Sequence, residues 1–82
     1  MEKLEELKKA LSEALKEKEI MVDDIYIEKK GKYTFLTVVL DKLGGIDLDG
    51  IVEATHIVNP IVDEYDICDK EYILDVISKE RG

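Results

Sequence analysis

The stretch from residue 36 to residue 50 constrains the fold most, because a strand pattern, a glycine turn and a helix start follow one another there directly. Leu36, Val38 and Leu40 occupy alternate positions, which gives a β-strand one apolar face. The pair Gly44–Gly45 follows and permits a tight reversal that few other residues tolerate. The stretch therefore predicts a strand that turns sharply into a helix.

Asp47 is the predicted N-cap of that helix, because it precedes a set of residues at helical spacing. We expect the helix to begin near Leu48 and to run towards Tyr65. Pro60 lies inside this range and has no N–H to donate, so we expect a kink or a break there. The residues at helical spacing are Leu48, Ile51, Val52, Thr55 and Val58.

The rest of the chain predicts one more helix and two more strands. Leucines at helical spacing indicate an amphipathic helix over about residues 2–18. A strand over 22–30, a glycine-centred turn at 30–32 and a return strand over 33–41 predict a hairpin, and a last strand is expected over 71–78. With 82 residues the chain forms one domain. The predicted fold class is α+β, in the order α-β-β-α-β, with two helices packed on one face of a three-stranded sheet.

The two faces of the predicted sheet are both rich in apolar residues. The helices are expected to cover Ile25, Ile27, Leu36, Val38, Leu40, Leu74 and Val76. The open face then presents Tyr26, Phe35, Thr37, Val39, Ile73 and Ile77, which is too apolar for permanent exposure to water. Contact with another domain or another copy of the chain would explain this face. A strand phase that slips by one residue would instead exchange the two faces.

The formal charge of −8 is concentrated in one part of the chain. Residues 41–75 contain ten acidic residues against only Lys42 and Lys70, which gives −8 for this segment alone. Such a surface repels phosphate backbones and attracts basic partners. The simpler interpretation is a solvated acidic surface that aids solubility.

No catalytic, cofactor or metal site is predicted. The acids at 41, 47, 49 and 53 do not have the spacing of a calcium loop, and His56 and Cys68 are too few to form a zinc site. A small core leaves little room for an enclosed pocket, so an enzyme or a small-molecule sensor is not expected. The chain has no membrane-length apolar run or signal-peptide pattern, and its single cysteine fits a reducing compartment. We expect a cytoplasmic protein that has no membrane partner.

Three segments resemble the N-terminal domain of the RimP family of bacterial ribosome maturation factors. They are Leu-Thr-Val-Val-Leu-Asp at 36–41, Gly-Gly-Ile-Asp-Leu-Asp at 44–49 and Tyr-Ile-Leu-Asp-Val-Ile-Ser at 72–78. The resemblance covers nearly all of residues 1–82 and implies a single RimP-like N-terminal domain. It also implies a second, barrel-like domain after the last strand, so this sequence is either an excised domain or a shortened natural form.

The resemblance implies a non-catalytic ribosome assembly factor that assists maturation of the small ribosomal subunit. Its expected partners are the small-subunit precursor and a basic small-subunit ribosomal protein near the decoding centre. The charge count agrees with such a partner, because an acidic surface suits a basic protein. We expect the docking surface to include Asp41, Asp47, Asp49, Glu53, Asp63 and Glu64.

Two other surfaces are candidates for contact. A self-associating scaffold or regulatory domain would use the open sheet face, through Tyr26, Phe35, Val39, Ile73 and Ile77. Ribosomal RNA could make a weak or secondary contact with the hairpin, where three lysines lie near Tyr26, Tyr33 and Phe35. These lysines are Lys29, Lys30 and Lys32.

Overall fold

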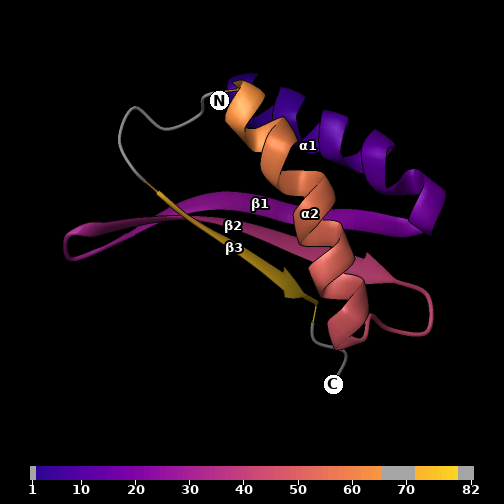
Figure 1. Cartoon of the computed structure of the whole chain (residues 1–82). Helices are drawn as coiled ribbons and strands as arrows, with labels where there is room; N and C mark the ends of the chain where they lie inside the picture. The colour runs from indigo at the N-terminus through magenta and orange to yellow at the C-terminus, as the bar shows by residue number, and fades with distance from the viewer. Residues whose placement is uncertain (1, 66–71, 80–82) are drawn as a thin grey trace.

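The computed structural model describes residues 2–65 and 72–79, which fold into a three-stranded sheet with two helices on one face (Figure 1). The order of elements is α-β-β-α-β, which confirms the predicted α+β class. The helices and strands are α1 (Glu2–Leu15), the short 3-10 helix η1 (Lys16–Lys18), β1 (Ile20–Lys30), β2 (Tyr33–Lys42), α2 (Leu48–Tyr65) and β3 (Ile73–Ser78).

Strand β2 lies at the centre of the sheet, in the order β1-β2-β3. It pairs antiparallel with β1 through the predicted hairpin, whose turn contains Gly31 at a φ of 61°. It pairs parallel with β3, with Phe35 opposite Ile73 and Val39 opposite Ile77. The sheet is therefore mixed, with an antiparallel edge at β1 and a parallel edge at β3.

The core lies between the sheet and the two helices (Figure 1). Leu7, Leu11 and Leu15 of α1 stand four residues apart, so they form one stripe on the helix. They are fully buried together with Leu36, Val38, Leu40 of β2 and Ala54, Val58 of α2. The burial of alternate β2 residues confirms the predicted strand phase and excludes a slip by one residue.

Strand β1 begins at Ile20, two residues before the predicted start. The register shifts between Val22 and Asp24, so Asp23 is an extra residue in the ladder. This bulge keeps Ile20 and Val22 on the same face as Ile25, and all three are buried. Simple alternation cannot reveal this, because the bulge changes the parity of the strand.

Two local predictions need correction. Ile27 was expected under the helices, yet 37% of it is exposed, because it stands near the hairpin end of β1. Of the kink or break predicted at Pro60, the break is wrong, since α2 continues through it to Tyr65. Pro60 is exposed while Val58 and Val62 are buried, so packing on both sides of it stabilises the helix. The predicted start of the last strand at Glu71 lies outside the described residues, as does Cys68.

Candidate functional site

The turn before α2 depends on two glycines. The Gly45 N–H donates to the Lys42 carbonyl oxygen at 2.8 Å, which closes a tight turn. Gly44 and Gly45 have φ angles of 87° and 89°, a region that strains residues with a Cβ atom. These glycines therefore fix where the chain leaves β2 and where α2 begins.

Asp47 caps α2, as predicted. Its Oδ1 accepts a hydrogen bond from the Gly50 N–H at 2.8 Å, and its carbonyl accepts the first helical bond from Ile51 at 3.1 Å. Ile46 and Ile51 flank the cap and pack against the core, in the arrangement of a hydrophobic staple. A Cβ atom on Gly50 would lie 2.9 Å from Ile46 Cγ2, so this packing requires glycine at position 50.

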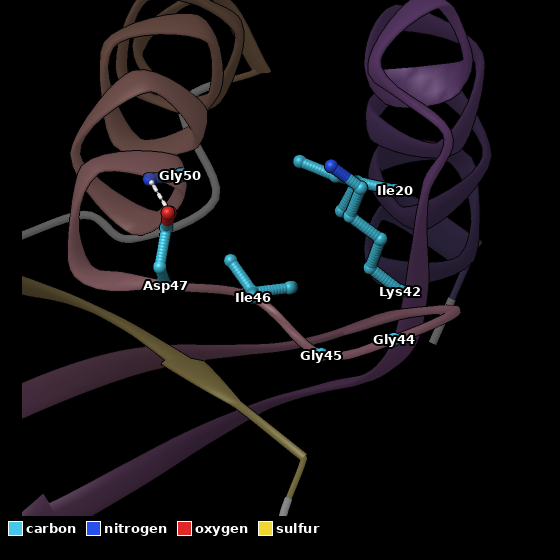
Figure 2. Close-up of a pocket in the computed structure, with 7 residues that line it drawn as sticks. All are labelled: Ile20, Lys42, Gly44, Gly45, Ile46, Asp47 and Gly50. Atoms are coloured by element: carbon cyan, nitrogen blue, oxygen red, sulfur yellow. Dashed lines mark hydrogen bonds between the residues drawn. The ribbon is translucent and has the colours of Figure 1, made fainter.

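An open hollow of about 370 Å³ lies beside this cap (Figure 2). Figure 2 shows Ile46 between the first turn of α2 and Ile20, with the Lys42 side chain extending to Ile20. A helix N-terminus beside a lysine resembles an anion site. Here, however, the Asp47 carboxylate already occupies the helix terminus, and its charge repels a bound phosphate. The hollow therefore offers no phosphate site.

The acidic face of α2 consists of the exposed carboxylates Asp49, Glu53, Asp63 and Glu64. The helix contains no lysine or arginine. At a rise of about 1.5 Å per residue, Asp49 and Asp63 lie roughly 21 Å apart along the helix axis. Glu53 forms an exposed ion pair with Lys18 at 3.4 Å, and Asp63 accepts a hydrogen bond from the Tyr72 hydroxyl at 3.2 Å. One side of the domain thus carries a row of negative charge about as long as the helix.

Apolar side chains accompany these acids. Leu48 is 79% exposed and Val52 is 49% exposed, although both belong to the set of residues at helical spacing that predicted the helix. The buried stripe of α2 instead follows Ala54, Val58 and Val62. If Ala54 is counted as apolar, Ala54, Val58 and Val62 form an i, i+4, i+8 series on a helix face that excludes Leu48 and Val52. The buried face of α2 could therefore have been predicted from the sequence. Two exposed aliphatic side chains, Leu48 and Val52, therefore lie next to the acids near the N-terminal end of α2.

Asp41 does not join the acidic face of α2. It pairs with Met21 in the sheet and follows the buried Leu40, so it lies on the open sheet face near the end of β2. Its Oδ1 accepts a hydrogen bond from the Lys42 N–H at 2.9 Å. The six predicted acids are thus divided between two sides of the domain, with Asp41 on one side and the capping Asp47 with the four acids of α2 on the other.

The open sheet face carries the predicted apolar residues. Register places Phe35 beside Ile73 and Val39 beside Ile77, while Tyr26 lies opposite Thr37. Tyr26, Ile73 and Ile77 are exposed, and Thr37 is buried because it lies between β1 and β3. Carboxylates surround this apolar centre: Asp24, Glu28 and Asp75 occupy alternate positions on the same face.

The hairpin lysines lie in different environments. Lys30 forms an ion pair with Glu28 at 3.5 Å, and its ammonium lies 5.9 Å from the centre of the Phe35 ring. Lys29 is the neighbouring residue of β1 and therefore points to the opposite sheet face. Lys32 lies in the turn. Their charges therefore do not form one patch.

The described residues contain no group of three histidine, cysteine or acidic side chains placed to hold a metal ion. Neither described helix has the length and hydrophobicity that a membrane span requires.

Comparison with known proteins identifies the family. The sequence model of the RimP N-terminal domain family matches residues 10–79, a range that includes all three strands and all of α2. The chain belongs to the RimP N-terminal domain family. The match confirms the resemblance carried by the strand and helix-start segments, and it covers every predicted contact residue.

A relative with this domain is the ribosome maturation factor RimP of Parafrankia sp. (strain EAN1pec). It is 32% identical over 62 residues, which cover 76% of this chain and 20% of the relative. The match therefore spans about a fifth of the curated relative's length.

Proposed function

We propose that this domain assists maturation of the small ribosomal subunit in the cytoplasm, as a non-catalytic module that binds a basic small-subunit ribosomal protein through the acidic face of α2. Family membership supports the ribosomal role, since the relative is a ribosome maturation factor. The row of exposed acids along α2, a helix that contains no lysine or arginine, supports the choice of a basic partner.

The acids at the C-terminal end of α2 carry this proposal. Asp47 and Asp49 stand at the N-terminus, where the helix dipole stabilises negative charge. Asp63 and Glu64 stand in the last turns, where the same dipole disfavours it, and no basic residue is present there. The helix dipole does not favour these two acids. Asp63 also accepts the Tyr72 hydroxyl, and attraction of a basic partner accounts for both acids.

Leu48 and Val52 complete the surface. Charges at the rim of an interface mainly raise the association rate, and buried apolar anchors supply most of the affinity. Val52 lies one helical turn from both Asp49 and Leu48, so a basic partner that docks on the acids there also covers these two side chains. Ribosomal RNA then makes at most a secondary contact with the hairpin lysines.

The test measures the dissociation constant of the chain for a purified basic small-subunit ribosomal protein. Asp49→Lys with Glu53→Lys should weaken binding at least about tenfold, or about 1.4 kcal/mol. The matched control, Glu6→Lys with Glu13→Lys on α1, makes the same change in net charge on other exposed acids. Equal weakening by both pairs, or unchanged binding in the α2 variant, would contradict the proposed surface.

Self-association through the open sheet face is the second candidate function. The exposed side chains of Tyr26, Ile73 and Ile77 favour it. The carboxylates on this face oppose it, because a second copy would bring the same charges towards them. Sedimentation of the purified chain over a range of concentrations decides between a monomer and a self-associating protein.

A further inference from the structure

The outer edge of β3 has hydrogen-bonding groups that the described residues do not use. Strand β3 pairs with β2 along one edge, and no other described strand pairs with it (Figure 1). The Lys79 N–H donates to the Leu40 carbonyl at 2.7 Å and so points to β2. Backbone groups alternate in direction along a strand, so Asp75 and Ile77 also face β2. The N–H and C=O groups of Leu74 and Val76 therefore point to the outer edge.

The two edges of the sheet differ in their protection against an added strand. Strand β1 contains a bulge at Asp23 and charged residues along its length, two devices that discourage pairing at an edge. Strand β3 contains no proline, lysine or bulge, and Asp75 is its one charged residue. The sheet therefore protects its β1 edge and leaves its β3 edge suited to pairing.

The side chains of β3 indicate what would pair there. Ile73 and Ile77 are 44% and 38% exposed on the open sheet face, and the exposed Asp75 stands between them. Asp75 forms no ion pair with any residue in the described ranges 2–65 and 72–79. A neighbouring strand with a basic residue beside Asp75 and apolar residues beside the two isoleucines would complement all three.

The net charge decides between a basic partner and a second copy. The chain carries −8, and Asp24 and Glu28 lie on the same sheet face as Asp75, with Glu28 paired with Lys30. A second copy would double this charge, whereas a basic segment would offset it.

We propose that the outer edge of β3 accepts an extended, basic segment of a protein partner as a fourth strand of the sheet. Backbone hydrogen bonds to Leu74 and Val76 hold the segment, and Asp75 selects a lysine or arginine beside it. The choice of a basic protein rests on the proposed function, while the binding mode rests on the geometry of β3. The site is separate from the acidic face of α2.

Amide hydrogen exchange, measured by NMR on the full chain, tests this proposal. The probe is a capped synthetic peptide, Lys-Val-Thr-Lys-Thr-Val-Lys, which places its valines and central lysine on one face of a strand. Without the peptide, the Leu74 and Val76 amides should exchange quickly, while the Asp75 and Ile77 amides should exchange slowly. Saturating peptide should slow the Leu74 and Val76 amides at least about tenfold and leave the other two unchanged.

Two controls separate strand addition from general attraction. The same peptide with its three central residues N-methylated keeps its charge. It lacks those backbone donors, and its N-methyl groups clash with a neighbouring strand, so it should neither pair with β3 nor slow the Leu74 and Val76 amides. Asp75→Lys should weaken binding of the peptide at least about threefold, whereas Asp49→Lys on α2 makes the same change in charge away from β3 and should have a smaller effect.

Leu74 and Val76 amides that are unaffected by the peptide, or already slow without it, would overturn the proposal. Protection that grows with protein concentration in the absence of peptide would assign the edge to a second copy and would also overturn it. Binding of the ribosomal protein to α2 with no effect on the β3 edge would refute strand addition and leave the proposed function intact. Protection by the peptide without binding of the ribosomal protein would refute the proposed function alone.

Discussion

Single residues determine how α2 begins. The Asp47 carboxylate accepts the Gly50 N–H, one of the first N–H groups that a helix leaves unpaired. Asp47→Ala should lower the free energy of unfolding by about 1 kcal/mol, within the range of roughly 0.5–2 kcal/mol known for N-caps. Urea denaturation measures this difference. Asp47→Asn keeps the acceptor and should retain most of the stability; if it costs as much as Asp47→Ala, the hydrogen bond is not the cause.

Gly50 contradicts the usual preference for alanine in a helix. Gly→Ala inside a helix normally stabilises by about 0.5–1 kcal/mol. At position 50 the new Cβ would lie 2.9 Å from Ile46 Cγ2, so we expect Gly50→Ala to lower the free energy of unfolding. In an Ile46→Ala background this methyl group is absent and only Asp47 Oδ1, at 3.1 Å, remains close, so Gly50→Ala should then destabilise less. A double-mutant cycle measures this difference, and additive effects would refute the steric explanation.

At the level of one element, Leu48 of α2 should matter for partner binding and hardly for stability. Leu48→Ala should change the free energy of unfolding by less than about 0.5 kcal/mol, because the side chain is mostly exposed. Leu11→Ala, at a fully buried position of α1, should cost about 2–5 kcal/mol. Leu48→Ala should nevertheless weaken binding of the basic ribosomal protein. A Leu48→Ala variant that binds normally would remove this side chain from the proposed surface.

The sequence predicts the elements well where one physical signal dominates. Alternation at Leu36, Val38 and Leu40 fixes the central strand, since a slip would place three large side chains in water. The start of β1 was not predictable in the same way, because the bulge at Asp23 interrupts alternation. The continuity of α2 through Pro60 was not predictable either, because burial of Val58 and Val62 decides it and local propensity does not include tertiary packing.

At the level of the whole molecule, the composition gives the number of acidic residues but not the surfaces on which they lie. The sequence shows an excess of acids between residues 41 and 75, yet it does not show that Asp41 lies on the open sheet face while Asp49 and Glu53 lie on α2. That division depends on strand parity and helix rotation. The chain therefore presents two acidic surfaces rather than the single surface that the count predicted.

Long-range attraction between these surfaces and a basic protein should depend strongly on salt. The Debye length falls from about 10 Å at 0.1 M salt to about 3 Å at 1 M, and it is then much shorter than the acidic face of α2. The association rate should therefore fall steeply with added salt, whereas the dissociation rate should change little. Stopped-flow mixing with the basic ribosomal protein measures both rates. A salt effect confined to dissociation would contradict electrostatic steering.

The most direct test of the central claim is an NMR titration of the labelled chain with the basic small-subunit ribosomal protein at low and at high salt. We predict chemical-shift changes along α2, from Leu48 to Glu64, that weaken at high salt. The absence of changes on α2, or changes confined to Tyr26 and Phe35 of the open sheet face, would contradict binding through the acidic face of α2.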